Sequence, residues 1–228
     1  MRILALETTE AIASVAALDG GFVLAETPLT SGGRSAQTVA PGINALLRQV
    51  GWRPSDVELV AVTAGPGSFT GLRVGVTTAK VFAFAVGAEV LGIDTLSTIA
   101  GRAPPDCAVV AVCVDAQRGD VVGQLFRRLD GGVLTAASPA TLAPAANWLA
   151  DLPAGTVVTG PALRRFRHLL APSIAALPEE LWPPTARSVG ELADRLYREG
   201  RRGDLLSLLP HYSRPSAAEE RRKLAGNN

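Results

Sequence analysis

The segment Ala64-Gly-Pro-Gly-Ser-Phe-Thr-Gly-Leu-Arg-Val-Gly75 joins an apolar stretch at residues 59–63, expected to be a strand, to a long apolar helix. Its glycines can adopt backbone conformations closed to residues with a Cβ atom, so another group can approach the chain closely here. The start of a helix presents free backbone N–H groups and the positive end of its dipole, which favour an anion. Small residues recur at every fourth position of the helix, a spacing that lets a second helix come near: Gly71, Gly75, Ala79, Ala83 and Gly87. The segment therefore indicates either an anion site or a helix-docking element.

Known phosphate-binding and nucleophile motifs do not fit this segment. A Walker loop needs Lys followed by Ser or Thr after its last glycine, whereas Gly71 is followed by Leu72 and Arg73. The glycine spacing also departs from the dinucleotide fingerprint. A nucleophile elbow needs Gly-x-Ser-x-Gly, which Ser68 lacks, so a hydrolase acting through Ser68 is the weakest of three hypotheses. A loosely held anion at the helix start stays open.

The helix that follows the glycine turn is apolar almost all round. Only Arg73, Lys80 and its threonines relieve this character, so the helix needs cover on two sides. One side is expected to pack on the chain's own sheet and the other on a partner helix, from this chain or another. The predicted partner-binding residues lie on this helix and on the preceding one: Gly71, Leu72, Val74, Gly75, Thr78, Ala79, Phe82, Val39 and Ile43. A bulky residue at Gly75 or Ala79 is then expected to block association while the single chain stays folded.

Composition excludes several classes of protein. Of the 228 residues 47% are hydrophobic, and the mean hydropathy is +0.23, which predicts a well-filled core and excludes disorder. A net charge of +1 gives no field that would gather nucleic acid over the whole surface, so tRNA would need a local patch or a partner to hold it. The apolar run at residues 3–6 is too short for an export signal, and the prolines within residues 131–150 disfavour a membrane span. We therefore expect a cytoplasmic protein without a membrane segment.

Metal ligation has no support in the sequence. Cys107 and Cys113 flank an expected strand, and His168 and His211 stand apart from them and from each other. None of these residues has the spacing of a metal-ligand cluster. We expect no metal site, and we expect both cysteines to be small core residues.

The two halves of the chain repeat one pattern of apolar strand, terminal carboxylate, polar turn, apolar strand and Asp-Gly-Gly. In the first half the carboxylate is Glu7 and the pattern ends at residues 19–21; in the second it is Asp115 and the pattern ends at residues 130–132. Repetition of a whole unit predicts an α/β protein in which a mixed-sheet unit is duplicated, and the two-lobe fold that the resemblance described below implies agrees with this duplication. The expected first lobe is residues 1–101, joined by a C-terminal segment at 211–228, and the second is residues 102–210.

The two strand-end carboxylates are the serious catalytic candidates. A carboxylate at the end of a first strand, beside hydroxyls such as that of Thr8, is the arrangement that positions a metal–nucleotide in actin-like kinases. The simpler alternative is that each carboxylate caps its hairpin turn by accepting backbone N–H groups. The residues that could mark a vestigial nucleotide or anion site are Glu7, Thr8, Ser68 and Asp115.

Several segments resemble the TsaB family, the non-catalytic partners in bacterial synthesis of tRNA threonylcarbamoyladenosine. They are the N-terminal Ile3-Leu-Ala-Leu-Glu7-Thr-Thr, the glycine segment at 65–75, Gly92-Ile-Asp-Thr-Leu-Ser97, Val114-Asp-Ala-Gln-Arg-Gly-Asp-Val121 and Pro210-His-Tyr-Ser-Arg-Pro215. Two features depart from the wider family. Residues 95–102 lack the metal-binding histidines of the catalytic relatives, and Gln117 stands where TsaB proteins usually have arginine.

The resemblance implies an actin-like (ASKHA) two-lobe fold and a scaffold that supports modification of adenosine 37. It implies association through the helices of the first lobe, either as a homodimer or with the catalytic paralogue TsaD, and the ATPase TsaE joins that complex. The chain would contact transfer RNA only through the complex. ATP or ADP would bind only at the assembled complex, and the isolated chain would have no cofactor. The alternative function is an ATP-dependent phosphotransferase that uses Glu7 or Asp115.

Overall fold

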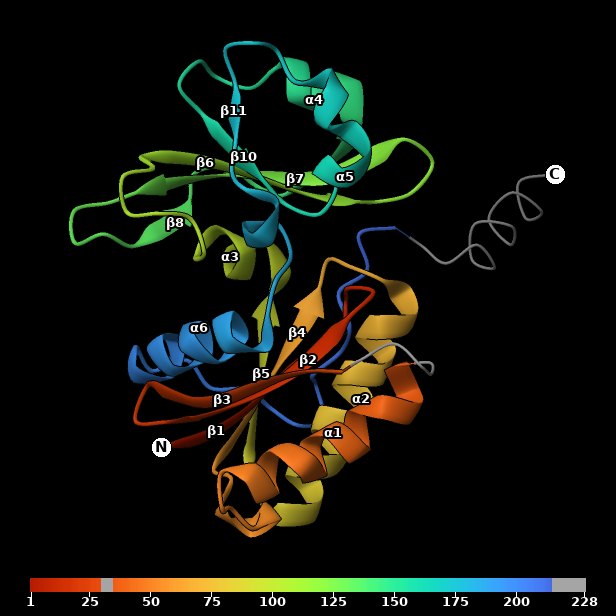
Figure 1. Ribbon diagram of the computed structural model, residues 1–228, viewed down its shortest axis with the longest axis vertical. Coiled ribbons are helices and arrows are strands. Elements are labelled where there is room, and N and C mark those ends of the chain that lie inside the picture. Colours follow the sequence, from red (N-terminus) through yellow and green to blue (C-terminus); the bar gives the residue numbers. More distant parts are fainter. Residues whose placement is uncertain (30–34, 215–228) are drawn as a thin grey trace, which may run out of the picture.

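The computed structural model describes residues 1–29 and 35–214 as two α/β lobes, one above the other in Figure 1. The first lobe contains a five-stranded sheet in the order β3-β2-β1-β4-β5. Its strands are β1 (Arg2–Glu7), β2 (Ala13–Asp19), β3 (Phe22–Leu29), β4 (Leu59–Gly65) and β5 (Glu89–Asp94). The β1–β2 and β2–β3 pairs are antiparallel, whereas β1–β4 and β4–β5 are parallel, so the sheet is mixed.

Helices cover both faces of the first sheet (Figure 1). On one face lie α1 (Ser35–Gln49), which a short 3-10 turn at Pro54–Asp56 follows, and α2 (Phe69–Val86). The opposite face is covered by α6 (Ala186–Arg198). Because strand side chains alternate between faces, β1 contributes Leu4 and Leu6 to the α1–α2 side and Ile3 and Ala5 to the α6 side.

The second lobe repeats this topology on a smaller scale. Its six-stranded sheet has the order β11-β10-β6-β7-β8, with β9 also paired to β7. The strands are β6 (Val109–Asp115), β7 (Asp120–Arg128), β8 (Leu134–Ala136), β9 (Thr141–Pro144), β10 (Val157–Thr159) and β11 (Ala175–Ala176). As β1 does with β2 and β4, β6 pairs antiparallel with β7 and parallel with β10. The predicted duplication of a mixed-sheet unit is confirmed.

Short helices cover the second sheet. On one face α3 (Thr95–Ala100) packs Leu96 and Ile99 against β6 and β7. The other face holds α4 (Ala145–Ala150) and α5 (Leu163–Phe166). Short 3-10 turns follow at Arg167–Leu169 and Glu179–Leu181.

The lobes exchange segments, which the predicted boundaries at 101/102 and 210/211 miss. Helix α3 was expected in the first lobe but packs in the core of the second, and α6 was expected in the second lobe but packs on the sheet of the first. Ala186 and Val189 on α6 are fully buried among residues of β1, β2 and β4, which is the physical reason for the difference. Of the predicted C-terminal segment, residues 215–228 lie outside the described part of the chain.

Candidate functional site

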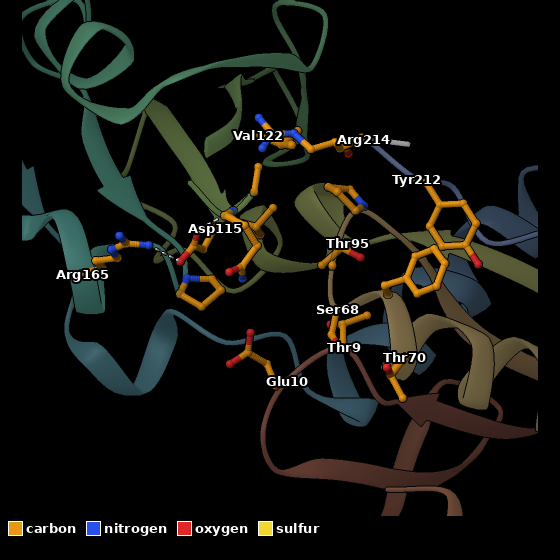
Figure 2. Close-up of a pocket in the computed structure, with 18 of the residues that line it drawn as sticks. Thr9, Glu10, Ser68, Thr70, Thr95, Asp115, Val122, Arg165, Tyr212 and Arg214 are labelled. Atoms are coloured by element: carbon orange, nitrogen blue, oxygen red, sulfur yellow. Dashed lines mark hydrogen bonds and ion pairs between the residues drawn. The ribbon is translucent and has the colours of Figure 1, made fainter. Parts of the chain in front are cut away.

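A cleft of about 820 Å³ lies between the two lobes, and Figure 2 shows the side chains around it. One wall is formed by the β1–β2 turn, the loop that leads into α2 and the start of α3. The other is formed by the end of β6 with its following turn, and by α5. Residues 212–214 complete the lining.

The glycine segment fits tightly against the β1–β2 turn. A Cβ atom on Gly71 would lie 2.0 Å from the carbonyl oxygen of Thr8, and one on Gly67 would lie 2.6 Å from Thr9 Cβ. The hydroxyl of Thr8 donates to the Gly71 carbonyl at 2.7 Å. These glycines therefore let the start of α2 touch the turn, and they leave no room between the two for a ligand.

Two of the four predicted anion-site residues do not reach the cleft. Glu7 is fully buried, and Thr8 is occupied by Gly71. Oε1 of Glu7 accepts from both the backbone N and the hydroxyl of Thr9, each at 2.5 Å, while its Oε2 has no partner among the described residues. Burial raises the pKa of Glu7 to about 7, against the lowering effect of the Thr9 hydrogen bonds. The prediction that Glu7 and Thr8 form part of the site is wrong, because both lie beneath its floor.

Ser68 and Asp115 do line the cleft, but both have structural partners. Asp115 accepts from the backbone N of Gln117 at 2.7 Å, as Glu7 accepts from Thr9, so both carboxylates cap their hairpin turns. That simpler alternative is confirmed. In the second hairpin Gln117 and Arg118 both have positive φ, at 66° and 58°, a conformation uncommon outside glycine.

Ser68 caps the start of α2. Its Oγ accepts from the backbone N of Gly71 at 3.3 Å, which satisfies a donor of the first helical turn. No histidine is among the described residues that line the cleft. A hydrolase acting through Ser68 would need such a base, so the geometry disfavours that hypothesis. Across residues 1–29 and 35–214, no group of His, Cys, Asp or Glu has an arrangement that could hold a metal ion.

Arginines that the sequence reading did not single out link the two lobes across the cleft. Arg164 on α5 forms a 2.7 Å ion pair with Glu10 of the β1–β2 turn, and Arg214 pairs with Asp120 of β7. Arg165 lies 3.6 Å from Asp115 on the same wall. The first two pairs join residues far apart in the chain, so no local pattern could have revealed them.

Residues 201–214 form a strap along the first lobe. His211 N donates to the Ala64 carbonyl at 2.6 Å, and Lys80 of α2 donates to the carbonyl oxygens of Leu206 and Leu208. Tyr212 stacks on Phe69 with ring centroids 4.6 Å apart. The strap thus delivers Tyr212, Ser213 and Arg214 to the cleft, where α2 begins.

Most of the predicted partner-binding residues are buried inside the first lobe. Gly71, Leu72, Gly75, Ala79, Val39 and Ile43 are buried, and the glycines of this group face Thr8 rather than open surface. Their assignment to a partner surface is therefore wrong, since the chain's own sheet already covers them. Val74, Thr78 and Phe82 are half-buried. The exposed side of α2, here called the α2 outer face, consists of Thr70, Arg73, Thr77, Val81, Phe84 and Ala85.

Helix α2 also has the length and apolarity of a membrane span, with 18 residues of mean hydropathy 1.3. In this fold it is a core helix of the first lobe, because Leu72, Ala79 and Ala83 are fully buried. Ser68 caps its start, and Gly87, with φ of 74°, ends it in the left-handed conformation.

The duplicated mixed sheets and the cleft between them define the actin-like (ASKHA) class of two-lobe α/β proteins. Residues 4–171 match the family model of TsaD, tRNA N6-adenosine threonylcarbamoyltransferase. The tRNA threonylcarbamoyladenosine biosynthesis protein TsaB of Bacillus subtilis is 30% identical over 65% of each chain, and that of Escherichia coli is 32% identical over 58% of each. The match thus spans less than two thirds of either relative. The solved structure of YeaZ from Pseudomonas aeruginosa superposes with a TM-score of 0.80 at 26% identity, over 92% of this chain and 99% of that one. The chain belongs to the TsaB/YeaZ family, among the sequences that the TsaD model describes.

Proposed function

We propose that this chain is a non-catalytic scaffold in the synthesis of threonylcarbamoyladenosine at position 37 of tRNA, and that it binds the catalytic paralogue TsaD. Relatives in Bacillus subtilis and Escherichia coli carry the name of that biosynthesis. We further propose that TsaE joins the complex, that tRNA is contacted only through it, and that ATP or ADP enters only there. The chain would work in the cytoplasm, with no cofactor of its own.

The α2 outer face is the observation that carries the proposal. Val81 is 63% exposed and Phe84 is 79% exposed, although the opposite side of the same helix is packed in the core. Apolar residues that repeat on one exposed helix face are suited to a second helix. A second copy of this chain is the alternative partner for this face, and it would compete with TsaD for the same surface.

An ATP-dependent phosphotransferase is disfavoured by the two carboxylates on which it depends. Glu7 is buried below the cleft, and Asp115 is held by Gln117 and Arg165. Only Asp115 lines the cleft, and there it is already engaged by Gln117 and Arg165. A scaffold function does not require a carboxylate that can bind a metal–nucleotide.

Replacing Phe84 by glutamate tests the proposed surface. We expect association with TsaD to weaken at least about thirtyfold, because a buried charge would replace a central apolar contact. Thermal unfolding of the isolated chain should change little, since this side chain is 79% exposed. The measurement is co-purification with TsaD, together with the modified fraction of tRNA in a reaction reconstituted with and without this chain.

Phe22 provides the matched control. It is 78% exposed on β3, at the far edge of the first sheet, so Phe22→Glu should bind TsaD like the unaltered chain. If Phe84→Glu co-purified as well as Phe22→Glu, the surface would be misassigned. If modification proceeded equally well without the chain, the scaffold function itself would be wrong.

A further inference from the structure

Exposed apolar side chains are concentrated along α2 and the strap of residues 201–214. The described chain exposes ten large hydrophobic side chains, and five of them belong to these two segments: Val81, Phe84, Leu206, Leu209 and Tyr212. Soluble proteins rarely gather exposed apolar side chains in one region unless that region binds a partner. The strap therefore has to be considered together with the α2 outer face.

The strap runs beside α2 in the opposite direction (Figure 1). Near the start of the helix Arg73 Nε donates to the hydroxyl of Tyr212 at 2.9 Å, and two turns later Lys80 Nζ donates to the carbonyl oxygen of Leu206 at 3.3 Å. Residues seven apart lie on the same side of a helix, so the strap follows one side of α2 over this distance. Leu206 and Leu209 are therefore neighbours of the α2 outer face.

The leucines of the strap are divided between core and surface. Leu208 N donates to the Asp204 carbonyl oxygen at 3.0 Å, which closes one turn of the chain. Around this turn Leu205 and Leu208 pack on the core of the first lobe, whereas Leu206 is 82% exposed and Leu209 is 70% exposed. Because the inward leucines anchor the turn, the outward leucines are held at the surface in a fixed place.

Arg73 adds a fixed positive charge to the same surface. Its guanidinium lies 3.9 Å from the centre of the Phe69 ring and donates to Tyr212, yet it forms no ion pair with any of the described residues. A guanidinium held in this way is well suited to a carboxylate of a binding partner. The strap's own carboxylate, Asp204, already accepts from the backbone N of Ser207 at 2.8 Å. A second copy of this surface would thus bring no unengaged carboxylate to Arg73, so a partner of different sequence is favoured.

We propose that TsaD docks on a composite surface made of the α2 outer face and the strap residues Leu206 and Leu209, and that it places a carboxylate on Arg73. This assignment rests on the scaffold function proposed above and adds the strap to the surface that TsaD covers. A stable complex buries about 800 Å² on each partner, more than the few apolar side chains on one helix face supply. With the strap beside it, α2 presents a wider apolar surface, and Arg73 at one end fixes the orientation of the partner.

Leu206→Glu and Leu209→Glu test the strap separately from the helix. We expect each change to weaken the binding of purified TsaD at least about tenfold, because a charge would be buried in an apolar contact. Thermal unfolding of the isolated chain should change little, since both side chains are largely exposed. Calorimetric titration of TsaD into the full chain measures the affinity. Arg73→Gln should make that affinity less sensitive to salt, because it removes one member of the ion pair.

Leu129→Glu provides the comparison, because Leu129 is 54% exposed in the second lobe, between β7 and β8, and its replacement should leave TsaD binding unchanged. If both strap variants bound TsaD as tightly as Leu129→Glu while Phe84→Glu did not, the strap would lie outside the docking surface, and the scaffold function would still stand. If they reduced self-association of the chain in sedimentation and left the TsaD affinity unchanged, the partner would be a second copy, and the assignment to TsaD would be wrong. Absence of TsaD binding by the unaltered chain would contradict the scaffold function itself.

Discussion

Replacing Gly71 by alanine is expected to destabilise the chain by about 3 kcal/mol, although the change adds one methyl group. The new Cβ would lie 2.0 Å from the Thr8 carbonyl oxygen and 2.9 Å from its carbon, and both are backbone atoms that cannot turn aside. Relief requires α2 to move away from the β1–β2 turn, which stretches the Thr8–Gly71 hydrogen bond. The intrinsic preference of helices for alanine, about 1 kcal/mol, is too small to compensate. Urea unfolding of the isolated chain measures the effect.

Gly101 gives a control in which the same substitution meets no obstacle. It has right-handed φ and ψ of −60° and −15°, and an added Cβ would stand 3.5 Å from its nearest neighbour, an ordinary contact. Gly101→Ala should leave stability unchanged or raise it by about 0.5 kcal/mol. A Gly71→Ala chain as stable as Gly101→Ala would show that α2 does not pack on the turn as described.

The same geometry corrects the expectation for Gly75. A Cβ there would lie 2.3 Å from Thr8 Oγ1 and 3.2 Å from a methyl group of Val62. A bulky residue at Gly75 should therefore disturb the core of the first lobe rather than leave a folded chain that fails to associate. Loss of binding in such a variant would not report on a partner surface, which is why the test above uses Phe84.

The fold class was predictable because the patterns that determine it can be read directly along the sequence. Apolar strands, turn glycines and the repeated strand–carboxylate–turn unit are local, and the two halves could be compared directly. Helix α6 is capped by Thr185, and Ser188 at the third helical position completes a capping box. Its place on the first sheet was not predictable, because amphipathicity shows that a helix has a buried face but does not name the sheet.

The site was less predictable, since its parts meet only after folding. Arg164 and Glu10 are 154 positions apart, and Arg214 and Asp120 are 94 apart. The role of the small residues at every fourth position of α2 was ambiguous for a different reason. A helix that packs closely on a strand turn and a helix that packs closely on another helix require the same glycines. Only the structure shows that the neighbour of Gly71 and Gly75 is Thr8.

Glu7→Gln is expected to stabilise the chain above neutral pH by about 3 kcal/mol. Burial raises the pKa of Glu7 from 4.5 to about 7 in the folded chain, which is about 2.5 units, and each unit is worth about 1.4 kcal/mol. Because the folded-state pKa is raised, the protonated carboxyl contributes fully below pH 4.5, and this contribution is lost as pH rises through 7. Glutamine resembles the protonated form: its oxygen can still accept from Thr9, and it carries no charge to bury.

Urea unfolding at a series of pH values separates this effect from the titration of other groups, because the difference between Glu7→Gln and the unaltered chain cancels what they share. We expect the difference to be small near pH 4.5, to grow between pH 5 and 7, and to be constant above pH 8. Glu199→Gln is the control, since this carboxylate is 59% exposed in a weak pair with Arg195, and its removal should change stability by less than about 0.5 kcal/mol at any pH. A difference for Glu7→Gln that did not vary with pH would mean that the carboxylate stays charged in the folded chain, and that the β1–β2 turn is open to water.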